Sequence, residues 1–216
     1  MTASMVKLED SLFFSGKRAM EIVLKGIIFA SLIIFAVLFV FSLVIFAVVH
    51  KTGGALFVPT PKVMIREIIN AVDFGRFDDI RELGTGDGRF ISAVERSYNR
   101  AVVGYEINPI AFFITWLKIH VFGLNSRVKF TNFWEQDLSG AQCIFCYLFP
   151  DIMVRLGEKL EGELKQGAYV ISANFTIPGW SEDTIVQVNH SIFNDPIYVY
   201  RIGNHKRDSS QAVAGL

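Results

Sequence analysis

The chain has 216 residues, a length that suits one ordinary domain with a short appendage. Its basic and acidic residues balance, so the formal net charge is zero. Enzymes that act on nucleic acids usually carry a basic field that gathers phosphates, and we therefore expect no nucleic-acid partner.

Residues 26–49 contain no charged side chain. A helix of this length would reach about 36 Å, enough to cross a hydrocarbon core of about 30 Å. A cleaved signal peptide would have a shorter apolar core, about 7 to 15 residues, and a small-residue cleavage site after it. We therefore predict an N-terminal flank at 1–25, one transmembrane helix at 26–49 and a linker at 50–60, short enough to hold the following domain near the membrane.

The segment 61–203 alternates between strand and helix patterns and is predicted to be one domain, with a disordered polar tail at 204–216. Such alternation indicates an α/β fold with a mostly parallel, seven-stranded sheet covered by helices on both faces. The expected strands are 80–83, 101–105, 128–130, 142–148, 168–172, 184–188 and 197–202, of which the last two form an antiparallel pair. The expected helices are 61–71, 89–98, 108–120 and 153–165. We expect Phe112, Phe113, Trp116 and Leu117 to pack against the sheet.

The most informative motif follows the first strand, where Gly84, Gly86 and Gly88 alternate with Thr85 and Asp87. Glycines at these positions let a strand turn sharply into a helix while the backbone lies close to a ligand. About twenty residues further on, the second strand ends at Glu106. An acid at that point is typical of Rossmann-like domains, in which it binds the hydroxyl groups of a ribose.

The spacing of the glycines distinguishes between two adenosine cofactors. Dinucleotide-binding turns usually follow G-x-G-x-x-G, whereas this one is G-x-G-x-G and has Glu82 two residues before it. An acid near this turn would repel a pyrophosphate but would suit the ammonium of S-adenosylmethionine (SAM). We therefore predict SAM as the cofactor, with Glu82 on its ammonium and Glu106 on its ribose. Asp87 either approaches the ligand or caps the following helix.

No metal site is expected. Cys143 and Cys146 are spaced by three in a strand, so they should point to opposite faces of the sheet and cannot share a metal. The four histidines are scattered without a ligand spacing.

Several further motifs resemble a known family. From about residue 55 to residue 202 the chain resembles the membrane-anchored class I SAM-dependent methyltransferases that include the lysine N-methyltransferases of the ATP synthase c-subunit and of the adenine nucleotide translocase. The matching segments are 58–61, 82–89, 104–109, 147–150, 172–175 and 178–180. The family usually has aspartate in place of Glu82, and an acid that binds the adenine amino group in place of Asn132. The amide oxygen of Asn132 can accept the same hydrogen bond without charge assistance.

The resemblance implies a membrane-anchored methyltransferase that modifies lysine side chains of a membrane-embedded protein. Tyr147, at the end of the fourth strand, is the candidate residue for lining the lysine channel. A lipid or quinone headgroup as substrate, and a non-catalytic SAM-binding module, remain alternatives. The positive-inside bias around the span is weak and, if anything, places the N-terminus inside. Because SAM is a cytoplasmic metabolite, we nevertheless expect a single-pass protein whose catalytic domain is cytoplasmic.

Overall fold

The computed structural model describes residues 3–52, 58–188 and 195–205, and the chain divides into two compact units, Met1–Val48 and Val49–Leu216. The first unit consists of one helix, α1 (Ala3–Thr52). Its segment Met20–Leu43 is apolar and fully exposed, and by length and composition it could cross a membrane. A signal sequence near an N-terminus has the same composition. The predicted transmembrane span lies within α1, and the predicted N-terminal flank is helical from Ala3. Residues 206–216, which form most of the predicted tail, lie outside the described residues.

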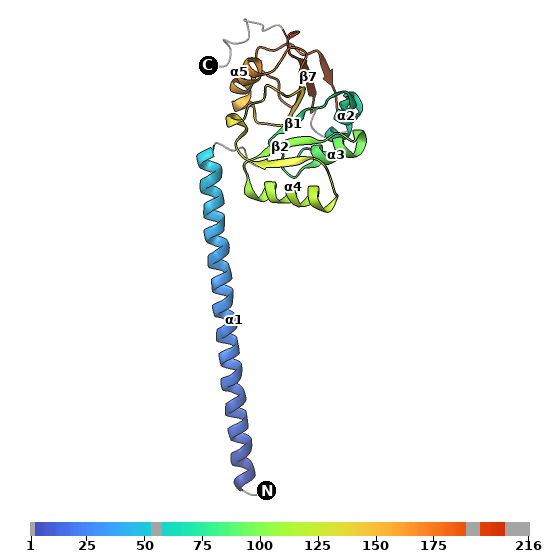
Figure 1. The fold of residues 1–216 in the computed structure, drawn as a ribbon. Helices are drawn as coiled ribbons and strands as arrows, with labels where there is room; N and C mark the ends of the chain where they lie inside the picture. The colour runs from blue at the N-terminus through green and yellow to red at the C-terminus, as the bar shows by residue number, and fades with distance from the viewer. Residues whose placement is uncertain (1–2, 53–57, 189–194, 206–216) are drawn as a thin grey trace. The chain divides into compact units, whose positions relative to one another are not determined.

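The second unit is built on a seven-stranded sheet in the order β3-β2-β1-β4-β5-β7-β6 (Figure 1). Neighbouring strands are parallel except at β7, which pairs antiparallel with both β5 and β6. The strands are β1 (Ile80–Leu83), β2 (Val102–Glu106), β3 (Arg127–Phe130), β4 (Cys143–Cys146), β5 (Tyr169–Ala173), β6 (Thr184–Val186) and β7 (Ile197–Arg201). All seven strands agree with the sequence-based prediction to within two residues at each end.

Helices cover both faces of this sheet, as predicted. One face carries α2 (Lys62–Ala71), α3 (Arg89–Tyr98) and α4 (Pro109–Val121), whose buried side chains join one hydrophobic cluster. The other face carries α5 (Met153–Glu163), whose leucines join a second cluster. Cys143 lies in the first cluster and Cys146 in the second, which confirms that the two thiols point to opposite faces.

Short-range chemistry sets where α4 begins. Asn108 precedes the helix with an extended backbone, and its side-chain oxygen accepts hydrogen bonds from the backbone N–H groups of Ile110 and Ala111. Pro109 occupies the first helical position, where the missing N–H costs nothing. This capping holds the start of α4 directly after Glu106, at the carboxyl edge of the sheet.

The outward face of α4 contradicts the sequence-based prediction. The helix packs on the sheet through Ala111, Thr115 and Ile119, which are spaced by four and form a narrow buried stripe. Phe113, Trp116 and Leu117 were expected in the core but are 57%, 39% and 46% exposed. Because the helix is apolar on nearly every side, its composition did not reveal which side faces the sheet.

Candidate functional site

The glycine turn joins β1 to α3 and has the predicted conformation. Gly84, Gly86 and Gly88 all have positive φ, at 75°, 59° and 74°. Residues with a Cβ rarely adopt this left-handed conformation. A Cβ on Gly88 would also come within 2.8 Å of the Thr115 side chain on α4. The turn is therefore restricted to glycine by both backbone conformation and space.

A fourth glycine fits the second strand against this turn. The Thr85 hydroxyl donates to the carbonyl of Tyr105, and a Cβ built on Gly104 would lie 2.2 Å from the Thr85 Oγ1. The backbone N–H groups of Gly84 and Thr85 donate to the same Tyr105 carbonyl. Thr85, predicted as a cofactor residue, is buried and holds the turn against β2.

Glu106 connects the turn to the start of α4. One carboxylate oxygen accepts the backbone N–H of Gly86 at 2.7 Å, and the other accepts those of Ile107 and Asn108 at 2.8 and 2.7 Å. Burial raises the pKa of this carboxyl, and the three N–H donors partly oppose the shift. The carboxylate therefore lies at the carboxyl end of β2, beside the glycine turn, where a ribose-binding acid is expected.

Glu82 is the most unusual group in the site. Its side chain is only 3% exposed, and its Oε2 is a buried polar atom without a hydrogen-bond partner among the described residues. Burial raises the pKa of Glu82 well above its ordinary value, and repulsion from Glu106 and Asp87 raises it further. A buried carboxylate oxygen without a partner is costly in free energy unless a donor or cation arrives.

These features fit the cofactor predicted from the sequence. A small cavity of about 20 Å³ lies between Glu82, the glycine turn and Tyr147, and residues 58–60 line its other side. This enclosed volume is roughly enough for one water molecule, so the cofactor also needs the open edge beside the strands. The ammonium of SAM would supply the missing partner for Glu82, and the turn would allow close approach of its backbone.

Asp87 pairs with cations rather than capping a helix. Its carboxylate is 2.9 Å from the Nε of Arg89 and 3.1 Å from the Nζ of Lys118 on α4. The residue at the cap position of α3 is Gly88, which has no side chain to accept a hydrogen bond. The alternative that Asp87 caps this helix is therefore wrong, because the left-handed Gly88 occupies the cap position. Arg89 also donates to the carbonyl of Thr60, which ties residues 58–60 to the turn.

Asn132 and Tyr147 lie at the carboxyl ends of β3 and β4, as predicted. The side-chain oxygen of Asn132 accepts the backbone N–H of Trp134 at 3.1 Å and so caps a short 3-10 turn, Phe133–Glu135. Tyr147 lines the small cavity, and burial raises the pKa of its hydroxyl. The tyrosine therefore stays protonated at neutral pH and is not suited to act as a base.

Two contributions from α4 were missed in the sequence analysis. The Thr115 hydroxyl donates to the carbonyl of Gly86 at 2.8 Å, and the Lys118 ammonium donates to the carbonyl of Asp87 at 2.6 Å. Both residues lie about thirty positions away along the chain, and no local motif links them to the turn. Their role depends on how α4 packs.

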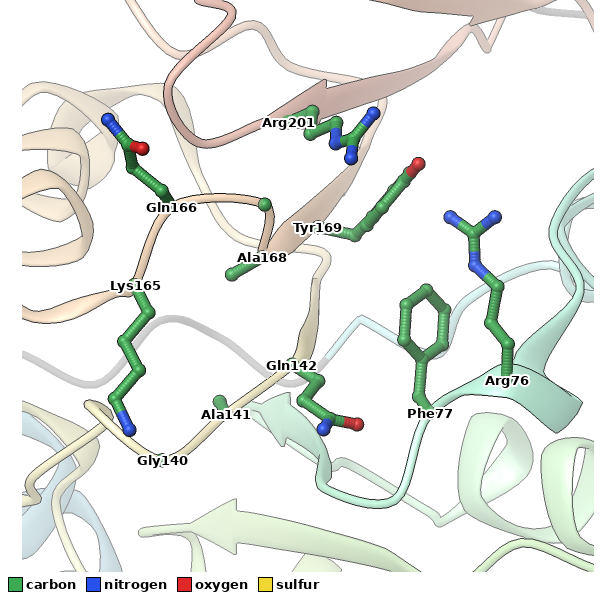
Figure 2. A pocket seen from close by; sticks show the side chains of 11 residues that line it. Arg76, Phe77, Gly140, Ala141, Gln142, Lys165, Gln166, Ala168, Tyr169 and Arg201 are labelled. Carbon is green, nitrogen blue, oxygen red and sulfur yellow. The ribbon is translucent and has the colours of Figure 1, made fainter.

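A larger pocket of about 570 Å³ lies at the opposite edge of the sheet. Segments that precede β1, β4 and β5 line it, together with the end of β7. Figure 2 shows Arg76 and Arg201 on either side of Tyr169, and the Arg76 guanidinium is 4.2 Å from the centre of that ring. Ligands of parallel α/β sheets bind at the carboxyl ends of the strands, so this pocket is separate from the cofactor site.

The strand order, the glycine turn and the acid at the end of β2 define a Rossmann-like class I methyltransferase, with SAM as its cofactor. A solved RNA methyltransferase from Salinibacter ruber, in complex with S-adenosyl-L-homocysteine, superposes with a TM-score of 0.62 and 27% identity, over 67% of this chain and 94% of the other. A methyltransferase from Pyrococcus furiosus shares the fold, with a TM-score of 0.55 and 16% identity, over 66% of this chain and 83% of the other.

The chain belongs to the family described as the ANTKMT methyltransferase domain, whose family model matches residues 82–184. A protein-lysine N-methyltransferase of Saccharolobus islandicus is 33% identical over 153 residues, which cover 69% of this chain and 95% of the relative. The adenine nucleotide translocase lysine N-methyltransferase of Mus musculus is 29% identical, over 60% of this chain and 58% of the relative. The chain therefore spans little more than half of the mouse protein.

Proposed function

We propose that this protein is a membrane-anchored methyltransferase that transfers a methyl group from SAM to lysine side chains of a membrane-embedded protein. The cofactor and the class of reaction follow from the fold and the family. Lysine as the acceptor is supported by the names of the relatives from Saccharolobus islandicus and Mus musculus. The membrane location is supported by the apolar segment Met20–Leu43.

One observation carries the catalytic part of the proposal: within the part of the chain that the structure describes, the buried Oε2 of Glu82 has no hydrogen-bond partner, and it lies beside a turn that favours glycine. A polar contact that is missing in the free protein and supplied by the ligand is a common arrangement in binding sites. The ammonium of SAM is a cation of the right size for this place. A dinucleotide would bring a pyrophosphate to three neighbouring carboxylates, which disfavours it.

The protein's contribution to methyl transfer is mainly positioning. SAM, when bound, would supply a methyl group attached to a positively charged sulfur. A neutral amine can attack the methyl carbon in line with that sulfur, which would leave as a neutral thioether. In the proposed arrangement Glu82 binds the ammonium, Glu106 the ribose hydroxyls and Asn132 the adenine. Fixing the reactants in this way provides the entropic part of catalysis.

The lysine substrate must lose a proton before it can react, since its ordinary pKa is about 10.4. Tyr147 is protonated at neutral pH and therefore does not serve as the base that accepts this proton. In this proposal its ring lines the lysine channel, and the π face of the ring contacts the ammonium of the lysine substrate. Desolvation in the channel lowers the pKa of the amine, and the proton leaves to water.

The catalytic domain is placed in the cytoplasm in this proposal, because SAM is made there. A C-terminal reporter that is active on only one side of the membrane tests this placement. Activity confined to the external side would contradict it.

The substrate class can be tested directly with the full chain. Membranes that contain the protein are incubated with methyl-labelled SAM, and protein, lipid and nucleic acid are then separated. We expect label in protein, in methylated lysine after hydrolysis. Label in lipid would instead support a headgroup substrate, and label in nucleic acid would overturn the proposal.

Two variants complete the design. Glu82→Gln removes the charge proposed to bind the ammonium and should abolish labelling. Glu158→Gln makes the same change at an exposed position on α5 and should leave labelling unchanged. If no fraction were labelled by the wild type while SAM still bound, the chain would be a non-catalytic SAM-binding module.

A further inference from the structure

The outward side of α4 and its neighbourhood form an unusual apolar surface. Single exposed hydrophobic residues are common on soluble proteins, whereas contiguous apolar patches mark interaction sites. Here eight large apolar residues that are between 36% and 67% exposed belong to one helix, the loop after it and the adjacent edge strand. They are Ile110, Phe113, Ile114, Trp116, Leu117, Val121, Phe122 and Phe130, which we call the α4 surface.

Ring contacts connect several side chains of the α4 surface and its neighbours. Phe113 stacks on Trp116 with ring centres 5.8 Å apart, and Trp116 lies 4.2 Å from the ring of His120. Phe130 on β3 lies 5.3 Å from Phe112. Figure 1 shows α4 along the outer side of the domain.

The segment that carries this surface has basic but no acidic side chains, although Asp87 from the glycine turn pairs with Lys118 and Glu95 from α3 accepts hydrogen bonds from Asn125 and Ser126. Residues 107–134 contain no aspartate or glutamate but contain Lys118, Arg127 and Lys129. The Arg96 guanidinium on α3 lies 4.6 Å from the ring centre of Phe122, at the border of the α4 surface. Long basic side chains beside apolar ones can bury their carbon stems while the charged group reaches anionic lipid headgroups.

We infer that the α4 surface lies in the interface of a lipid bilayer, as a second membrane contact beside the N-terminal helix. The helix α4 has 13 residues, about 20 Å, which is too short to span a hydrocarbon core of about 30 Å but suited to lie along its surface. Tryptophan and phenylalanine beside basic residues are the usual composition of such interfacial helices. This inference rests on the proposed membrane location.

The chain supports a bilayer as the occupant rather than a second copy of the protein. Only residues 53–57 separate the end of α1 from the first described residue of the domain, Val58. A fully extended chain of that length covers roughly 20 Å. If Met20–Leu43 spans the membrane, the rest of α1 after Leu43 adds only about 13 Å to this reach. The domain is then tethered close to the bilayer, and an exposed apolar helix on it is within reach of lipid.

A membrane contact at α4 would also affect the cofactor site. Thr115 and Lys118 bind the backbone of the glycine turn, and the start of the helix directly follows Glu106. A lipid-bound α4 therefore holds the carboxyl edge of the sheet near the bilayer surface. A lysine of a membrane protein that lies near the bilayer surface would then be close to the bound cofactor.

The inference can be tested by site-specific fluorescence in the full chain. A polarity-sensitive label is placed at Phe113→Cys or Val121→Cys, and the protein is reconstituted in vesicles of phosphatidylcholine and phosphatidylglycerol. The matched control is Val154→Cys, which is equally exposed but lies on α5 at the other face of the sheet. Cys143 and Cys146 are fully buried and burial raises the pKa of both thiols, of Cys146 to about 12, so they should remain unlabelled.

We expect lipids that carry a nitroxide quencher near the top of the acyl chain to quench the labels at 113 and 121 several-fold more than the label at 154. Equal quenching at all three positions would overturn the inference. Labels at 113 and 121 that are shielded from both lipid quencher and aqueous iodide would show a protein occupant, such as a second copy, and would also overturn it.

A second variant connects the contact to activity. Leu117→Glu should lower methylation of membrane-embedded protein several-fold and leave the Kd for SAM unchanged, whereas Val154→Glu should change neither. Wild-type levels of methylation by Leu117→Glu would contradict the proposal that the membrane contact contributes to methylation. The quenching measurement needs neither cofactor nor substrate, so strong quenching in an inactive protein would refute the proposed function alone, and absent quenching in an active one would refute only this inference.

Discussion

At the scale of single residues, the site depends on two buried carboxyl groups with different surroundings. Glu106 has three backbone N–H donors, whereas one oxygen of Glu82 has no hydrogen-bond partner in residues 3–52, 58–188 and 195–205. Burial raises the pKa of both. Three backbone N–H donors oppose this shift at Glu106, whereas at Glu82 only the backbone of Ile91 does. Glu106 therefore suits a neutral partner such as a ribose, and Glu82 suits a cation.

Replacing Glu106 should weaken SAM binding. Hydrogen bonds to a charged group contribute about 1.5–3 kcal/mol, so Glu106→Ala should raise the Kd roughly tenfold to a hundredfold or more. Isothermal titration calorimetry measures the change. Glu135→Ala, an exposed acid on the short turn after β3, serves as the control and should bind normally. Unchanged affinity in Glu106→Ala would rule out the ribose role.

Replacing Glu82 should stabilise the free protein. Its folded-state pKa is raised above the ordinary value of 4.5, so its favourable contribution is complete below about that pH. The contribution is lost as pH rises through the higher folded pKa, because the ionised form is disfavoured by burial. Without cofactor, the unfolding temperature of Glu82→Gln should therefore exceed that of the wild type, by a margin that grows with pH.

The same measurement with SAM separates stability from function. SAM should raise the unfolding temperature of the wild type and should have little effect on Glu82→Gln, because a ligand stabilises only the state it binds. Equal stabilisation of both proteins by SAM would contradict the ammonium role. A variant less stable than the wild type at alkaline pH would contradict the assigned cause of the pKa shift.

At the scale of elements, the close fit between β1 and β2 depends on Gly104. A Cβ at this position would lie 2.2 Å from the Thr85 Oγ1 and 2.9 Å from the Ile91 side chain. Gly104→Ala should therefore lower the free energy of unfolding by about 1–3 kcal/mol and should weaken cofactor binding by moving the turn. Thermal or urea unfolding measures the loss.

A matched glycine gives the opposite expectation. Gly162 lies in α5, and no atom outside its local surroundings lies within 4 Å of a Cβ built there. Gly162→Ala should raise stability by about 0.5–1 kcal/mol, because alanine restricts the unfolded chain and favours helix. Equal effects of the two substitutions would show that packing at Gly104 is less restrictive than the structure indicates.

Elements were predicted more reliably than their faces. Patterns in adjacent residues predicted the strands that alternate with helices. In the same way, Asn108 and Pro109 predicted where α4 begins. The buried face of α4 had none, because the helix carries apolar residues on almost all sides. Asp87 shows the same limit at shorter range, since its partner Lys118 is distant in sequence.

At the scale of the whole molecule, the apolar segment of α1 should hold the protein in a membrane. Ile34→Asp with Leu38→Lys places two charges within Met20–Leu43. Each charge near the centre of a span costs about 2.5–3.5 kcal/mol in insertion. We expect the wild type to remain in membranes after alkaline extraction and the double variant to be released.

The control for this experiment is Ile34→Leu with Leu38→Ile, which keeps the segment apolar and should stay in the membrane fraction. Release of the wild type would contradict an anchor. An N-terminus found to be cleaved after the apolar segment would show that the segment acts as a signal sequence.

The sequence alone determined the fold class, the glycine turn and the choice of SAM, and it predicted cofactor-binding roles for Glu82 and Glu106. These are local patterns: backbone conformation, strand and helix periodicity, and the charge beside a turn are all recorded in adjacent residues. Only the tertiary structure decided that Oε2 of Glu82 has no partner among the residues it describes, that Thr115 and Lys118 donate hydrogen bonds to the turn, and that the aromatic side of α4 faces outward. Each of these depends on distances between segments far apart in the chain, and burial and pairing at such contacts are set by packing.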